Sequence, residues 1–172
     1  MASAGRQLLV MRHAKSAWPE GVADLDRPLN RRGEQASATI GSFLLVNDLL
    51  PDHVVASPAR RARDTAELVL QAAGQRPSVR VERELYEGDV MRVVRELPPD
   101  ARRALLVGHQ PDMGELLHAL CGVDAHIPTG LLALLELEGP WSVQPAGRSV
   151  LQLLVGPRML GAAPWTTVSN RT

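Results

Sequence analysis

Residues 8–13 read Leu-Leu-Val-Met-Arg-His, four apolar side chains followed directly by an arginine and a histidine. A short apolar run of this kind is typical of a strand that is buried on both faces of a parallel sheet. The arrangement returns at residues 104–109, where Ala-Leu-Leu-Val-Gly precedes His109. Each segment therefore predicts a buried strand with a histidine just after its end.

Strand-like and helix-like segments alternate along the first three quarters of the chain. A charged, proline-containing stretch at 15–29 reads as a loop, and the segments around it follow a regular order. That order is a strand at 8–11, a helix at 32–45, a strand at 53–56, a helix from Ser57-Pro58 to about Ala73, a strand at 79–82, a helix at 90–97, a strand at 104–107 and a helix at 112–120. The alternation predicts a three-layer α/β/α fold around a mostly parallel central sheet.

The pattern changes after Gly130. Three further strand-like segments follow, at 131–137, 142–143 and 149–154, separated by turns that contain Gly and Pro. Consecutive strands with short connections pair antiparallel, so we expect these C-terminal strands to add an antiparallel edge to the sheet.

The composition of the 172 residues narrows the class of protein. Nineteen basic residues balance 19 acidic ones, so no overall charge attracts nucleic acid or an anionic membrane. No apolar run approaches the roughly 18 residues that cross a bilayer, and charged residues interrupt the apolar stretch near the amino terminus. Cys121 is the only cysteine, which suits a reducing compartment. We expect a single cytoplasmic domain over 1–172, with a loose tail after about residue 164 and with neither nucleic-acid nor membrane partners.

Residues that suit anion binding follow the ends of the predicted strands. Ligands of open α/β sheets bind at the carboxyl ends of the strands. The residues placed there are Arg12-His13, Ser57 with Arg60-Arg61 nearby, Leu85-Tyr86-Glu87 and Gly108-His109. Arginine forks and a helix amino terminus near Ser57 can bind phosphate oxygens, and an imidazole beside the phosphorus can be a nucleophile or an acid and base. These residues alone leave the choice between the two roles open.

Five segments resemble, in order, the motifs of the histidine phosphatase superfamily. They are 9–16 (LVMRHAKS), 28–36 (PLNRRGEQA), 57–66 (SPARRARDTA), 85–87 (LYE) and 107–111 (VGHQP). The resemblance covers about residues 8–122 and is greatest to the SixA-type phosphohistidine phosphatases.

Three positions depart from the pattern of the superfamily. Lys15 stands where phosphoglycerate mutases carry Glu, Pro19 stands where they often carry Asn, and Asn30 replaces the usual Thr. The first two departures change the loop that faces the substrate, and they weaken the interpretation as a mutase.

The resemblance implies a phosphatase that uses neither a metal nor a cofactor. In this reading His13 forms a covalent phosphohistidine, Arg12, Arg61 and His109 hold the phosphoryl oxygens, and Glu87 donates a proton. Two arginines and a protonated histidine would supply the positive charge that phosphoryl transfer requires. His13 must be neutral to attack, so we expect a partner that fixes its tautomer. The substrate would be a protein phosphohistidine or a small phosphate compound.

Several residues also have a plainer explanation. The hydroxyls of Ser16 and Ser57 are candidate substrate ligands, yet each equally suits a turn or a cap. Glu87 lies among charged residues and suits a solvated loop, and Arg60 rivals Arg61 because both follow the same strand.

Two alternative functions remain for the whole chain. One is phosphoryl transfer of the phosphoglycerate mutase type, and the other is a non-catalytic phosphate-binding module on the same scaffold. Only about twenty residues separate Glu87 from Gly108, which leaves little room for a lid that excludes water, so we expect hydrolysis.

Overall fold

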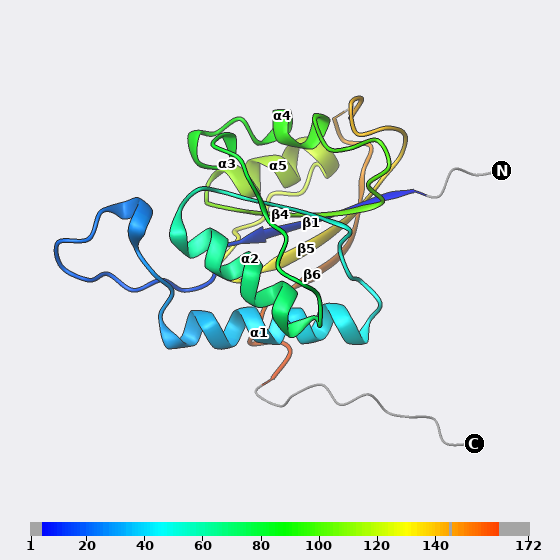
Figure 1. Cartoon of the computed structure of the whole chain (residues 1–172). Helices are drawn as coiled ribbons and strands as arrows, with labels where there is room; N and C mark the ends of the chain where they lie inside the picture. Colours follow the sequence, from blue (N-terminus) through cyan, green and yellow to red (C-terminus); the bar gives the residue numbers. More distant parts are fainter. Residues whose placement is uncertain (1–4, 145, 162–172) are drawn as a thin grey trace, which may run out of the picture.

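The chain forms a six-stranded sheet with helices on both faces, in a computed structural model that describes residues 5–144 and 146–161 (Figure 1). The strand order is β3-β2-β4-β1-β5-β6. The strands are β1 (Arg6–Arg12), β2 (His53–Ala56), β3 (Arg80–Val81), β4 (Arg103–Gly108), β5 (Leu132–Leu137) and β6 (Val150–Val155). The first four are parallel to one another, whereas β5 pairs antiparallel with β1 and β6 pairs antiparallel with β5. The predicted mostly parallel sheet with an antiparallel C-terminal edge is confirmed.

The helices form two layers, one on each face of the sheet (Figure 1). On one face lie α1 (Arg31–Val46) and α2 (Arg60–Ala72), and on the other lie α3 (Glu84–Glu87), α4 (Val90–Arg95) and α5 (Asp112–Cys121). A short 3-10 helix, η1 (Asp24–Asp26), interrupts the loop that follows β1. No helix in the described part of the chain has both the length and the hydropathy to cross a membrane.

Alternating side chains of β1 enter two separate cores. Leu8 and Val10 pack with residues of α3, α4 and α5, whereas Leu9 and Met11 pack with residues of α1 and α2. All four side chains are fully buried. Burial of such side chains stabilises a fold by roughly 1.5–3 kcal/mol each, so the strand stays in the sheet interior up to Met11. The polar residues Arg12 and His13 consequently mark the point at which the chain leaves the sheet.

The structure departs from the prediction at residues 142–143, which form no strand. The indole of Trp141 is buried and its Nε1 donates to the carbonyl of Ala101 at 2.9 Å. The amide of Val143 donates to the carbonyl of Pro140 at 3.1 Å, which closes a turn. The buried anchor of Trp141 therefore holds this segment as a turn rather than as an extended strand.

Several elements also differ in extent or type from those predicted. The helix expected at Ser57 begins at Arg60, because the Ser57 hydroxyl accepts the amide of Ala59 at 3.2 Å ahead of the first turn. The third strand is reduced to β3, two residues long, and the Leu85-Tyr86-Glu87 segment forms the short helix α3 instead of a loop. The tail predicted to be loose after about residue 164 lies outside the described residues.

The pairing of the parallel strands brings three strand ends to one edge of the sheet. Arg12 is opposite Gly108 in the register of β1 and β4, and Ala56 is opposite Val107 in that of β2 and β4. The next residue along each strand is then His13, His109 or Ser57. These three side chains start from neighbouring positions although up to 96 residues separate them in sequence (109 − 13 = 96).

Candidate functional site

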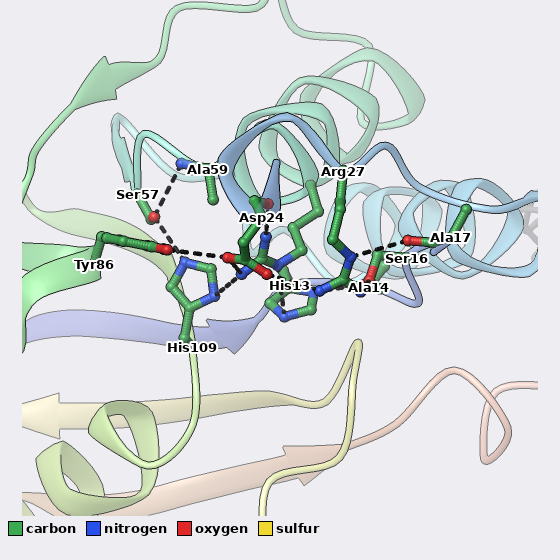
Figure 2. A network of polar contacts seen from close by, with 11 residues as sticks. His13, Ala14, Ser16, Ala17, Asp24, Arg27, Ser57, Ala59, Tyr86 and His109 are labelled. Atoms are coloured by element: carbon green, nitrogen blue, oxygen red, sulfur yellow. Dashed lines mark hydrogen bonds and ion pairs between the residues drawn. The ribbon is translucent and has the colours of Figure 1, made fainter. Parts of the chain in front are cut away.

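The residues at this edge form one connected network, which Figure 2 shows from close by. The rings of His13 and His109 lie 5.1 Å apart between centroids, tilted by 54°. The guanidinium of Arg61, from the first turn of α2, lies between them and bonds to both. The structure therefore brings the two histidines and Arg61 together, as predicted from their positions after the strands.

A backbone carbonyl fixes the tautomer of His13. Its Nδ1 lies 2.7 Å from the oxygen of Ala14. A carbonyl oxygen only accepts hydrogen bonds, so Nδ1 carries the ring hydrogen and Nε2 presents its lone pair to the site. Burial lowers the pKa of His13 to about 3 despite the opposing bond to Ala14, and the neighbouring cations lower it further. The ring is accordingly neutral near pH 7, the state in which an imidazole is a nucleophile.

Arg61 is the centre of the network. Its Nε lies 3.4 Å from Nε2 of His13, and its Nη2 lies 3.4 Å from Nδ1 of His109. The same guanidinium donates through Nη1 to the carbonyl of Asp24 at 2.6 Å and through Nη2 to the Asp24 carboxylate at 3.0 Å. His13, His109 and Asp24 therefore all contact the guanidinium of Arg61, which is largely buried. Arg60, its rival in the sequence, instead pairs with Asp64 at 3.4 Å on the outside of α2.

The surroundings of His109 favour its neutral form in this structure, whereas the protonated state was expected while it holds a phosphoryl group. Its Nε2 lies 2.7 Å from the Ser57 hydroxyl, while Nδ1 faces the donating Nη2 of Arg61. Because Nδ1 accepts, the ring hydrogen belongs on Nε2. Burial first, and the charge of Arg61 second, lower the pKa of His109 to about 4. The Asp24 carboxylate raises the pKa of His109, but this does not offset burial and the positive charge of Arg61.

Arg12 holds an incomplete set of hydrogen bonds. Its Nη1 donates to the carbonyl of Ile127 at 2.9 Å, but its buried Nε has no partner among the described residues. Burial and the positive charge of Arg61 lower the pKa of Arg12. An anion bound between the two guanidiniums would relieve their repulsion and accept free donors.

Asp24 is a site residue that was not predicted from the sequence. Its carboxylate accepts hydrogen bonds from Arg27 at 2.9 Å, from Arg61 at 3.0 Å and from the hydroxyl of Tyr86 at 3.0 Å. Partial burial alone would raise its pKa, but these three bonds together lower it to about 2. The Asp24 carboxylate thus binds the Arg61 guanidinium that was expected to bind phosphoryl oxygens. Asp24 belongs to no sequence motif. Only the tertiary fold places η1, and with it Asp24, beside Arg61.

The loop that carries Asp24 is anchored at Arg27. The guanidinium of Arg27 donates to the Ser16 hydroxyl at 2.6 Å and to the carbonyl of Ala17 at 3.1 Å. It also stacks on the ring of Trp18, with 3.1 Å between its central carbon and the ring centroid. Ser16 therefore holds the loop in this structure, whereas Ser57 lies directly against His109.

Glu87 points away from the network. It is exposed, and its carboxylate pairs with Arg83 one turn earlier at 2.7 Å. Among the described residues it forms no bond to His13, Arg61 or His109. Successive helical residues point about 100° apart, and the preceding residue, Tyr86, is the one that faces the site. The Tyr86 ring meets the His109 ring edge-on at 5.4 Å (Figure 2).

This arrangement suits the transfer of a phosphoryl group to an imidazole. A neutral Nε2 lies 3.4 Å from Arg61, the charges of Arg12 and Arg61 both act on the His13 ring, and a second imidazole lies beside it. Such groups can clamp the equatorial oxygens of a phosphoryl group while the nucleophile attacks the phosphorus. No cluster of three or more His, Cys, Asp or Glu side chains that could bind a metal occurs within residues 5–144 and 146–161.

Comparison with known proteins is consistent with this chemistry. A model of the histidine phosphatase superfamily (branch 1) matches residues 8–105. An uncharacterised protein of Mycobacterium tuberculosis is 35% identical over 150 residues, which cover 78% of this chain and 92% of that protein. The structure of a proposed phosphohistidine phosphatase SixA from Nakamurella multipartitia superposes with a TM-score of 0.75 at 31% identity, covering 91% and 99% of the two chains. A second proposed SixA, from Agrobacterium tumefaciens, gives 0.75 at 26% identity, covering 90% and 100%.

Proposed function

The chain belongs to the histidine phosphatase superfamily, and from this we propose that it hydrolyses a phosphorylated substrate through a covalent phosphohistidine on His13. The substrate class is a protein phosphohistidine or a small phosphate compound. The observation that carries the proposal is the state of His13, whose Nδ1 is bound to Ala14 and whose Nε2 faces Arg61 at 3.4 Å. A ring held in this way is neutral, oriented and beside a cation that attracts phosphate.

In the first step, Nε2 of His13 attacks the phosphorus and the bond to the leaving group breaks. Arg12, Arg61 and His109 hold the phosphoryl oxygens during this step, and the positive charge of the two guanidiniums offsets the negative charge of those oxygens. The ring of the resulting phosphohistidine is positively charged, and its Nδ1–H still donates to the carbonyl of Ala14. That hydrogen bond grows stronger as the charge develops, because charged donors form stronger bonds than neutral ones. In this mechanism the two guanidiniums offset the charge of the phosphoryl oxygens, so the step requires no metal.

In the second step, water attacks the phosphohistidine, which releases inorganic phosphate and restores the neutral ring. The chain between α3 and β4 contains only α4 and its short connections, with no long segment that could cover the phosphohistidine. This short connection offers little to exclude water, which favours hydrolysis over return of the phosphoryl group to a held acceptor. This supports the phosphatase over the mutase alternative.

The group that protonates the leaving oxygen is Asp24 in this mechanism, rather than the Glu87 implied by the family resemblance. Asp24 is a carboxylate while it lies on Arg61, so it donates no proton in the substrate-free protein. An arriving phosphoryl group competes for Arg61 and places a negative charge beside the displaced carboxylate. Both changes raise the pKa of Asp24, because a like charge disfavours the ionised form. A leaving imidazole would need such a proton less than an alkoxide would.

Trapping of the intermediate tests the proposal. The protein is mixed with a ³²P-labelled phosphate monoester or a phosphohistidine peptide, quenched in base within milliseconds and analysed for labelled protein. We expect label on His13, stable in base and lost in acid, and no label in His13→Asn. The non-catalytic alternative predicts binding with no release of phosphate, and normal turnover by His13→Ala would overturn the covalent mechanism.

A further inference from the structure

A cleft of about 690 Å³ opens beside the proposed active site, between α1 and the turn that follows β6. One wall is formed by Arg32, Gln35 and Thr39, which lie on one face of α1. The opposite wall is formed by Pro157 to Met159 of the turn, and Leu131 also lines the cleft. Volumes of this order are typical of pockets that bind small molecules.

The cleft lies close to His13 along the backbone. Lys15, which lines the cleft, is two residues from His13, a distance of at most about 7 Å along the chain. The amide of Gly130 donates to the carbonyls of Arg12 and His13, both at 3.1 Å. A side chain at Gly130 would approach the ring of Pro157 at 3.1 Å, so the residues after β6 pack closely on this segment. The cleft therefore lies beside the backbone that carries the nucleophile, at the same edge of the sheet.

The position of Lys15 is set by close packing against α1. The amide of Asn30 donates to the carbonyl of Lys15 at 3.0 Å. A side-chain carbon at Gly33 would overlap that same carbonyl, so only glycine permits the first turn of α1 to lie this close. The wall that carries Lys15 and Arg32 is consequently built from ordered backbone rather than from a free loop.

The charged residues that line the cleft are all positive. They are Lys15, Arg32 and Arg158, and no Asp or Glu is among the lining residues. None of the three forms an ion pair or a side-chain hydrogen bond within the part of the chain that the structure describes, whereas Arg27, Arg60 and Arg61 are all paired with carboxylates. In a chain with no net charge, three free cations around one cleft form a local site for an anion.

Apolar residues separate the three cations. Leu131, Pro157 and Met159 line the cleft together with the charged side chains. A ligand that fills this space would need an apolar body and an anionic end. Inorganic phosphate alone would leave the apolar surface uncovered.

We propose that this cleft binds a second anionic group of the substrate, and that the protein therefore acts on small phosphate esters whose apolar body ends in a carboxylate or another phosphate. The inference rests on the proposed phosphatase and names the substrate class of its site. His13 takes the phosphoryl group, and Lys15, Arg32 and Arg158 hold the second anion. The apolar body of the ester lies against Leu131, Pro157 and Met159.

A matched pair of esters tests this specificity. Hexyl phosphate and the phosphate ester of 6-hydroxyhexanoic acid have the same kind of leaving alkoxide and differ in the terminal carboxylate. We expect the second ester to have a kcat/KM about tenfold higher, because a charge-assisted contact to arginine is worth about that factor. The preference should fall in Arg32→Gln and Arg158→Gln and nearly disappear in the double variant. Arg31→Gln, whose side chain is next to Arg32 but does not line the cleft, should retain it.

Binding of non-hydrolysable analogues separates this inference from the proposed function. Calorimetry with hexylphosphonate and 6-phosphonohexanoate measures the same preference without turnover. If the carboxylated phosphonate binds more tightly and neither ester is hydrolysed, the cleft stands as an anion site and the hydrolysis of small phosphate esters falls. If both esters are hydrolysed at equal kcat/KM, or the double variant retains the preference, the phosphatase stands and the cleft proposal falls. If neither phosphonate binds, the cleft proposal falls, and the phosphatase is decided by trapping of label on His13 from a phosphohistidine peptide.

Discussion

The carboxylate of Asp24 lies 3.0 Å from Nη2 of Arg61, on the guanidinium whose Nε faces His13 at 3.4 Å. The Asp24 carboxylate thus pairs with the same Arg61 guanidinium that would hold the phosphoryl group of the substrate. Phosphate has to replace this carboxylate when it binds, and Arg27 and Tyr86 remain available to hold Asp24 afterwards. This exchange leads to the first two predictions.

Asp24→Asn should strengthen the binding of inorganic phosphate. An amide competes less well than a carboxylate for Arg61, so we expect a Kd for phosphate that is lower by about tenfold. Calorimetric titration at pH 7 measures it. Asp26→Asn removes a charge from the same loop at a residue that forms no side-chain contact with Arg61, and it should change the Kd much less. Equal effects of the two substitutions would attribute the change to general charge instead.

The proton donor should be identified by how much its substitution lowers kcat for substrates with different leaving groups. Asp24→Asn should reduce kcat for an alkyl phosphate by 10²-fold or more on the usual scale of general acid catalysis, and should reduce kcat for p-nitrophenyl phosphate much less. The nitrophenolate leaves readily without a proton. Glu87→Gln should leave both rates within about twofold, because Glu87 is exposed and paired with Arg83. A selective loss with alkyl phosphates in Glu87→Gln would restore the role implied by the family resemblance.

Stability should decrease on acidification because the pKa of His13 is lowered on folding. Its ordinary pKa is 6.5 and its value in the fold is about 3, so between these pH values the unfolded chain binds a proton that the folded chain does not. The free energy of unfolding then falls as pH decreases through this window, by at most about 1.4 kcal/mol per pH unit from this group. Urea denaturation at pH 7.5, 6 and 5 should show a steeper loss in the wild type than in His13→Asn. The lowered pKa of Asp24 acts only below pH 3.8, outside the measured range.

Anion binding should protonate His109. In the structure burial and Arg61 lower its pKa to about 4. A phosphate dianion between Arg61 and Nδ1 would reverse the balance of charge and favour the imidazolium, which then donates to phosphate. Two-dimensional NMR of imidazole nitrogens at pH 6.5 should show His109 neutral alone and protonated with saturating phosphate. A ring that stays neutral in the complex would mean that the two arginines supply the charge without it.

The elements built from local patterns were predictable. The apolar runs of β1 and β4 are buried on both faces, which is why their sequences contain no polar alternation. The positions of His13 and His109 after these strands followed from the same runs. The turn at residues 142–143 was not predictable, because the buried indole of Trp141 and its bond to Ala101, 40 residues away, decide it.

The sequence by itself determined which residues end the buried strands, because apolar runs and their spacing report burial directly. It therefore determined the α/β fold and the candidates Arg12, His13 and His109. Only the tertiary structure decided what lies opposite them: the Asp24 carboxylate on Arg61, and Glu87 turned outward. These depend on how a loop without a periodic pattern crosses the sheet edge and on the rotation of one short helix. Asp24 is bonded to Arg61 and Tyr86, 37 and 62 residues away, which places the loop and turns Tyr86 of α3 toward the site, and no local pattern of residues reports such bonds.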